Sequence, residues 1–143
     1  MPSIDAVSVG DELTPTRRTL AQADLIRYAG ASGDFNPLHW DPDFAAEVSP
    51  TGGVIAHGML NMGLVSQLVT DWAGGPEHVV SLDVTFRKPC PVGLTVTAGA
   101  VVTAVDADAG TATLSVWVEG PDGERLVDRR KSTAVARLES RRS

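Results

Sequence analysis

The segment from His57 to Trp72 constrains the fold more than any other part of the chain. Its apolar side chains are spread over more than one face of a helix: Met59, Leu60, Met62, Leu64, Val65, Leu68, Val69 and Trp72. A helix that is apolar around most of its circumference is typical of a helix surrounded by other structure. The sequence therefore predicts a buried central helix over residues 57–72, which ends at Gly74-Gly75-Pro76.

After this helix the hydrophobic pattern changes to period two, which is typical of half-buried strands. We expect four antiparallel strands over residues 80–87, 94–105, 111–119 and 125–138, separated by glycine- and proline-rich turns. Before the helix, residues 13–20 predict a short edge strand, residues 21–31 a helix, and residues 41–47 one or two helical turns. The polar tail from Glu139 to Ser143 predicts a frayed end. This order favours an α+β fold in which a curved antiparallel sheet wraps one helix.

Length, charge and cysteine usage limit the classes of protein to consider. The 143 residues suit a single domain over 1–143, and the net charge of −6 with a pI near 4.9 argues against a nucleic-acid partner. No apolar run is long enough to cross a bilayer, and the first residues show no signal-peptide pattern, which argues against a membrane partner. Cys90 is the only cysteine, so neither an internal disulfide nor a cysteine-rich zinc site is expected. These features predict a cytoplasmic protein.

The segment from Tyr28 to His39 carries the candidate chemistry. It places a carboxylate, Asp34, five positions before an imidazole, His39, and the turn formers Gly33 and Asn36-Pro37 accompany them. Both groups are therefore expected on a stiff loop, where they could transfer protons at one point. The plainer interpretation is an Asx turn or helix N-cap at Asp34 or Asn36, with an ordinary hydrogen-bonded histidine.

This loop resembles the hydratase motif of the MaoC-like family, whose members have the hot-dog fold. The motif runs from an aromatic residue through Ser-Gly-Asp-x-Asn-Pro-aliphatic-His to a small residue, and its positions are filled here by Tyr28, Ser32, Gly33, Asp34, Asn36, Pro37, Leu38, His39 and Ala45. A second family feature, His-Gly-Met at the start of the central helix, is present as His57-Gly58-Met59. The amino-acid sequence around these two motifs is similar to that of catalytic subunits of mycobacterial-type 3-hydroxyacyl-ACP dehydratases. One departure is Gly52-Gly53, where many relatives have Arg-Pro.

The resemblance implies a hydro-lyase that interconverts 2-enoyl thioesters and (R)-3-hydroxyacyl thioesters of CoA or acyl carrier protein. It implies that Asp34 and His39 share the acid and base roles, in an order that the residues leave open, and that the backbone N–H of Gly58 stabilises the thioester oxygen. Asn36 and Ser66 match family positions that support this pair by hydrogen bonding. No metal or cofactor is implied, and no substrate-binding residue is assigned. A homodimer is expected, or a heterodimer with a second hot-dog subunit.

The same fold is compatible with three other functions. A non-catalytic acyl-binding subunit would have no reason to keep both Asp34 and His39, although a heterodimer in which this chain is the catalytic half is allowed. A hot-dog thioesterase usually needs a carboxylate on the central helix, where this chain has only Asp71, near the far end. Addition of a nucleophile other than water is left open.

The basic residues Arg87, Lys88, Arg129, Arg130 and Lys131 have two interpretations. They either lie on the solvated face of strands, which the sequence favours, or bind CoA phosphates or an acidic carrier protein.

Overall fold

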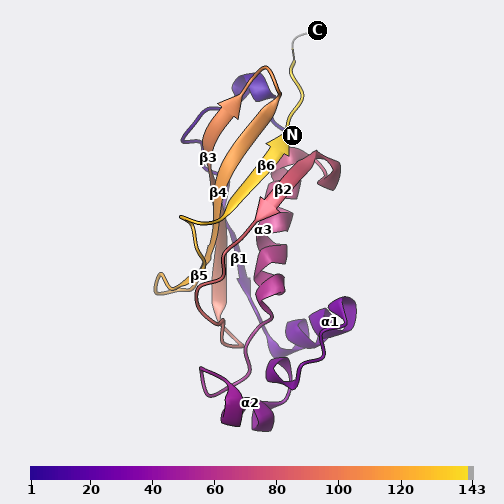
Figure 1. The fold of residues 1–143 in the computed structure, drawn as a ribbon, viewed down its shortest axis with the longest axis vertical. Helices are drawn as coiled ribbons and strands as arrows, with labels where there is room; N and C mark the ends of the chain where they lie inside the picture. The colour runs from indigo at the N-terminus through magenta and orange to yellow at the C-terminus, as the bar shows by residue number, and fades with distance from the viewer. Residues whose placement is uncertain (142–143) are drawn as a thin grey trace.

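A computed structural model describes residues 1–141 of the chain (Figure 1). A curved antiparallel sheet packs against one long helix, α3 (Gly58–Ala73). The shorter helices α1 (Gln22–Ser32) and α2 (Pro42–Val48) and the 3-10 turn η2 (Pro37–His39) gather beyond the N-terminal end of α3. Within the described residues, no helix is both long and apolar enough to cross a membrane. The expected α+β architecture, with a central helix within one residue of its predicted bounds, is confirmed.

The six-stranded sheet has the order β1-β3-β4-β6-β2, with β5 paired to β4. Its strands are β1 (Thr16–Thr19), β2 (Val79–Asp83), β3 (Thr95–Asp106), β4 (Thr111–Glu119), β5 (Arg125–Val127) and β6 (Thr133–Arg137). The side chains of β4 that alternate toward α3 are fully buried: Ala112, Leu114, Val116 and Val118. The edge position predicted for the first strand is also confirmed.

Helix α3 is buried or half-buried around most of its circumference. Its most buried face carries Leu64, Val65, Leu68 and Val69. The exposed positions form a narrow stripe along the helix, in which Met59 is 54% exposed. The expectation of a buried central helix packed against a curved sheet is therefore confirmed, with this stripe left uncovered in the single chain. The remaining apolar surface is available to another chain.

Two details of the predicted strands are wrong. The last strand is not continuous over 125–138, because buried Asp128 and Ser132 form a turn between β5 and β6, and Arg129, Arg130 and Lys131 lie in that turn. In β2 the pairing with β6 shifts between Val79 and Ser81, so Val80 faces outward and is 54% exposed. A shift of one residue moves side chains to the opposite face of a strand, and hydrophobicity alone did not reveal the irregularity.

The polar C-terminal tail is held in place as far as the structure describes it. The backbone N–H of Arg141 donates to Asp5 Oδ2 at 3.0 Å and to Ser3 Oγ at 3.2 Å. The expectation of a frayed tail is therefore wrong up to residue 141. Its remainder, residues 142–143, lies outside the described residues.

Candidate active site

The first site residue, Asp34, follows a sharp turn at the end of α1. Gly33 ends this helix with φ +76°, a left-handed conformation in which a side chain would be strained. Ser32 Oγ donates to the carbonyl of Tyr28 and accepts from the N–H of Asp34 at 3.2 Å. Asp34 Oδ1 in turn accepts from the N–H of Asn36, which leaves Oδ2 free to face other groups. The Ser-Gly-Asp sequence therefore fixes the direction of the carboxylate by local hydrogen bonds.

The second site residue, His39, ends the short turn η2. Asn36 caps this turn, because its Oδ1 accepts from the N–H of Leu38 at 3.0 Å, and Pro37 has the backbone angle that a first helical position needs. The His39 ring is held from the far side by a 2.7 Å contact between its Nδ1 and the carbonyl oxygen of Ile55. A carbonyl can only accept, so this nitrogen carries the hydrogen, and in the neutral ring Nε2 is the free acceptor.

These two turns bring Asp34 and His39 together. His39 Nε2 lies 3.9 Å from Asp34 Oδ2, with the imidazole largely buried and the carboxylate 53% exposed. This separation is too long for a direct hydrogen bond but short enough for both atoms to bond to one water molecule. The plainer interpretations of the motif, an Asx turn at Asp34 and an N-cap at Asn36, also hold. The local caps therefore build the loop that positions the pair.

His57 contacts both His39 and Asp34. Its ring stacks on that of His39 with centroids 3.8 Å apart, and Tyr28 packs edge-on against it at 4.8 Å. His57 Nε2 donates to the backbone carbonyl of Asp34 at 3.0 Å, so this buried ring links both halves of the site. Burial lowers the pKa of His57, and nearby His39 adds to that effect, while the bond to the Asp34 carbonyl opposes it. These contacts give His57 a positioning role.

Acidification should therefore destabilise the protein through His57. The unfolded chain takes up a proton at this residue near pH 6.5, whereas the folded protein takes it up only at lower pH, so stability falls as pH drops below about 6.5. Thermal unfolding midpoints measured from pH 8 to pH 5 should show a smaller acid loss for His57→Gln than for the unchanged protein. Equal losses in the two proteins would contradict this account of His57.

Gly58 begins helix α3 directly beside the pair. The first backbone N–H groups of a helix have no partner within it, and the helix dipole favours negative charge there. Gly58 and His39 line the same cavity, of about 290 Å³, together with Phe86, Cys90 and Asn61. A side chain at position 58 would begin 3.4 Å from the Phe86 ring. The glycine thus leaves an open approach to its N–H from this cavity.

Asn61 is a site residue that the sequence reasoning did not identify as such. It is 3% exposed and lines the cavity one helical turn beyond Gly58, and its Oδ1 has no hydrogen-bond partner among the described residues. A buried unpaired amide oxygen is costly, so a donor from a bound molecule would stabilise it. The available signal was a lone asparagine in an apolar helix three positions after Gly58. Cys90 lies in the same wall, and burial raises the pKa of its thiol, which argues against a nucleophilic thiolate.

The remaining predicted residues are farther from the reacting atoms. Asn36 supports the site through the backbone of η2 and makes no side-chain bond to Asp34 or His39. Ser66, two turns along α3 from Gly58, makes no hydrogen bond to that pair within residues 1–141. Its supporting role stays a prediction that rests on the motif alone.

The same cluster contains residue types that can bind a metal ion. Asp34, His39 and His57 each offer a possible ligand atom, and these atoms lie within 4.8 Å of one another. However, His57 Nε2 donates to the carbonyl of Asp34, His39 Nδ1 is bonded to the carbonyl of Ile55, and the two imidazole rings are stacked face to face. The geometry favours proton transfer over metal binding.

Comparison with known proteins identifies the family of the chain. The family model described as "MaoC like domain" matches residues 6–119. The (R)-specific enoyl-CoA hydratase of Aeromonas caviae is 35% identical over 117 residues, which cover 81% of this chain and 86% of that protein.

Solved structures show the same fold over nearly the whole chain. The structure of the (R)-hydratase from A. caviae involved in PHA biosynthesis superposes with a TM-score of 0.84 at 33% identity, covering 93% of this chain and 98% of that one. The ChsH1–ChsH2 complex from Mycobacterium tuberculosis gives a TM-score of 0.80 at 27% identity, over 93% and 99% of the two chains. With the family model matching most of its length and this hydratase related throughout, the chain belongs to the MaoC-like family of hot-dog proteins.

Proposed function

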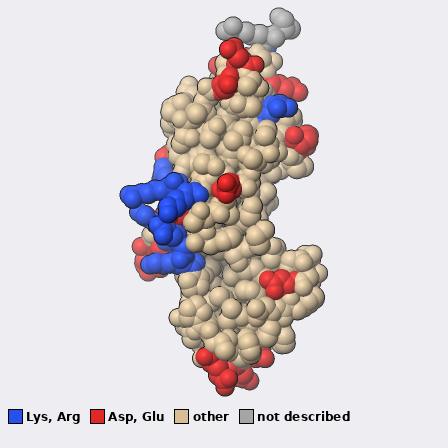
Figure 2. All heavy atoms as spheres, viewed as in Figure 1, with Lys and Arg blue, Asp and Glu red and all other residues tan. Residues whose placement is uncertain are grey.

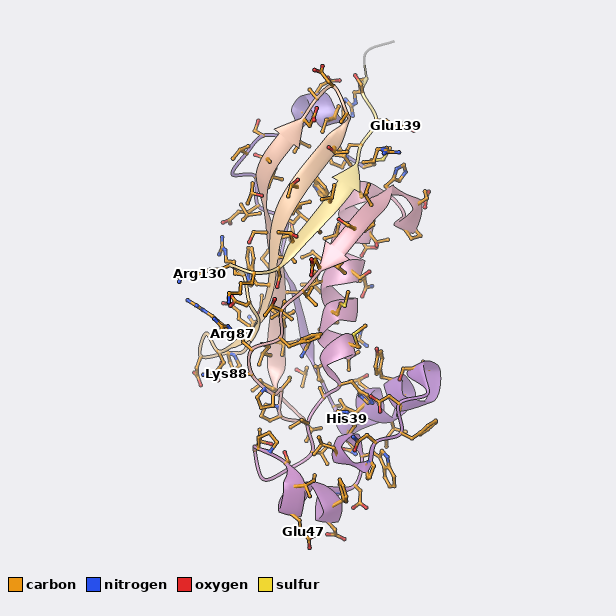
Figure 3. The ribbon with its side chains drawn as sticks, viewed as in Figure 1. His39, Glu47, Arg87, Lys88, Arg130 and Glu139 are labelled. Carbon is orange, nitrogen blue, oxygen red and sulfur yellow. The ribbon has the colours of Figure 1, made fainter. Side chains whose placement is uncertain are left out.

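We propose that this protein is a hydro-lyase that adds water across the double bond of 2-enoyl thioesters to give (R)-3-hydroxyacyl thioesters, and catalyses the reverse dehydration. The observation that carries the proposal is the 3.9 Å separation of His39 Nε2 and Asp34 Oδ2 beside the N-terminus of α3. The similarity to an (R)-specific enoyl-CoA hydratase supports this reaction. Figure 3 shows His39 in the lower part of the molecule, where the first turn of α3 meets α1 and α2.

In the proposed reaction, one water molecule is held between the two side chains. With its Nδ1–H donated to Ile55, His39 offers Nε2 as an acceptor, and the Asp34 carboxylate offers a second acceptor. The water oxygen forms a bond to C3 of the enoyl group as its proton passes to this pair. A proton from the pair then reaches C2, so that one water is added and both side chains return to their starting states.

The attack on C3 moves electron density onto the thioester oxygen, which needs a donor at that moment. We assign this part to the N–H of Gly58, because it opens from the first turn of α3 into the cavity that His39 also lines. A fixed amide at a helix N-terminus stabilises developing negative charge without having to reorganise. Asn61 Oδ1, in the same cavity, is placed to accept from an N–H of the bound thioester.

We further propose that residues 1–143 work as one hot-dog domain paired with a second one, in a homodimer or a heterodimer. Exposed apolar side chains around the site support pairing, notably Phe35 and Trp40 beside Asp34 and Met59 on α3. The open edge strand β2, with exposed Val80, offers a further contact. A cytoplasmic location is proposed from the free, buried Cys90 and the absence of cystine pairs in the described chain.

The direct test is hydration of crotonyl-CoA by the purified protein. We expect the enoyl-thioester absorbance to fall after enzyme addition, and chiral analysis of the hydrolysed product to give (R)-3-hydroxybutyrate. Size-exclusion chromatography with light scattering would report the oligomeric state in the same preparation. A folded dimer that leaves both crotonyl-CoA and longer 2-enoyl-CoA esters unchanged would overturn the proposed function.

A further inference from the structure

Two segments that are far apart in the sequence form one basic surface. Arg87 and Lys88 follow strand β2, whereas Arg129 and Arg130 lie in the turn between β5 and β6. Figure 3 shows Arg87, Lys88 and Arg130 on the same flank, and Figure 2 shows basic side chains gathered there, whereas most other charged side chains on that face are acidic. The expectation that these residues lie on the solvated face of strands is therefore wrong, because the chain leaves the sheet at both places.

A buried carboxylate holds the two segments together. Asp128, which is 1% exposed, accepts from Arg87 Nε at 2.6 Å and from the backbone N–H of Arg130 at 2.9 Å. The N–H of Asp128 donates to the carbonyl of Thr85 at 2.8 Å. Both bonds to the carboxylate lower the pKa of Asp128, the backbone N–H of Arg130 most. The arrangement of the cations is thus built into the fold.

This basic surface contains cavities, and one of them is the cavity of the candidate active site. The cavity of His39 and Gly58 has Arg87 and Lys88 in its wall, and these two residues also line a second cavity, of about 430 Å³. That second cavity shares Arg125 with a third one, of about 350 Å³. The three cavities therefore lie in series between the candidate catalytic pair and the arginines of the β5–β6 turn, each sharing lining residues with the next.

The far part of this series, which we name the basic hollow, combines Lys88, Arg125, Arg129, Arg130 and Trp117. The Arg129 guanidinium lies 3.9 Å from the centroid of the Trp117 ring. Two carboxylates, Glu119 and Glu124, also line it, so the cations outnumber the acids there. The whole chain has a net charge of −6, so the local excess of positive charge here is opposite in sign to the net charge of the protein.

We propose that the basic hollow binds the phosphates of coenzyme A while the pantetheine arm of the same thioester runs along the series of cavities to His39. This inference rests on the proposed function and names the carrier of its substrate. Guanidinium groups match phosphate oxygens in charge and geometry, and the Trp117 ring holds the Arg129 guanidinium in place among them. The hollow also belongs to the series of cavities that leads to the site, as one linear molecule requires.

Coenzyme A fits these observations better than an acyl carrier protein. A carrier protein would present a broad acidic surface with one phosphate, for which a flat or convex basic patch would be enough. Here the cations lie in walls of cavities with an aromatic side chain among them, which is the form of a site for a small polyanion. The carrier protein becomes one outcome of the test.

The test compares substrates that differ only beyond the pantetheine arm. We would prepare the variant Arg129→Ala/Arg130→Ala and, as a control with the same charge change, Arg17→Ala/Arg137→Ala, whose residues do not line the hollow. The ratio of kcat/KM for crotonyl-CoA to that for crotonyl-pantetheine should fall about tenfold in the first variant, the effect of losing two exposed ion pairs with phosphate. The control should keep the ratio of the unchanged protein.

Calorimetry provides a readout that does not depend on turnover. The unchanged protein should bind CoA more tightly than 3′-dephospho-CoA, and both more tightly than pantetheine, with affinity falling as salt is raised. Equal affinity for all three, or an unchanged kcat/KM ratio in the double variant, would overturn the assignment of the hollow. Loss of activity with crotonyl-ACP alone would assign the surface to a carrier protein instead. If the protein turned over neither crotonyl thioester but still preferred CoA, the proposed reaction would fail and the hollow would stand.

Discussion

Replacing His39 by glutamine, or Asp34 by asparagine, should lower kcat/KM for crotonyl-CoA by about 10²–10⁴. Each change keeps the approximate shape of the side chain but removes one of the two atoms, His39 Nε2 or Asp34 Oδ2, that would exchange protons with water. Because the two atoms serve the same water, the double variant should lose little more than either single variant. Steady-state kinetics of the three variants in parallel would measure this non-additivity.

The control for this series is Asp43→Asn. Asp43 is an exposed carboxylate in the first turn of α2, so this variant makes the same chemical change outside the site. It should retain the kcat/KM of the unchanged protein. Thermal unfolding of each variant would separate a lost proton transfer from a lost fold. Turnover within a factor of a few in either folded single variant would remove the proposed pair from the mechanism.

Replacing Gly58 by proline should lower kcat by about 10²–10³, the usual cost of losing one oxyanion donor. Proline has no N–H, yet it is favoured at the first helical position, which Gly58 occupies in α3. The preceding residue, His57, already has φ −58° and ψ 134°, a conformation that proline allows before it. The substitution therefore removes the donor while helix α3 is retained, and circular dichroism would check that retention.

The matched variant is Gly58→Ala, which keeps the N–H. Its added methyl group would lie 3.4 Å from the Phe86 ring, an ordinary van der Waals contact, so we expect only a modest change in KM. The difference in kcat between the proline and alanine variants reports the loss of the N–H together with the bulk of the proline ring on the nitrogen. Equal kcat values for the two would show that the N–H of Gly58 takes no part in stabilising the thioester oxygen.

Much of the site could be predicted because its hydrogen bonds are local. Ser32, Gly33 and Asn36 act on partners within a few residues, and such caps and turns can be read from residue types and spacing. The bond from His39 to Ile55 and the stacking on His57 could not be read in this way, because they join segments whose spacing in the sequence sets no distance between them. Asn61 was missed for a related reason, since its burial depends on the walls supplied by Pro89 and Cys90.

The central helix, the long strands and the loop that carries Asp34 and His39 could all be predicted from residue types, because periodicity, proline and glycine act on the nearest residues. The position of the break in the last strand, and the surface that the arginines share, depend instead on contacts between distant segments. The sequence around Asp128 contains no local signal of a turn. Asp128 holds the turn by accepting a hydrogen bond from Arg87, which is forty-one positions away in the chain. Local rules fix which elements form, whereas the joining of distant charges through one buried carboxylate is a property of the packed molecule.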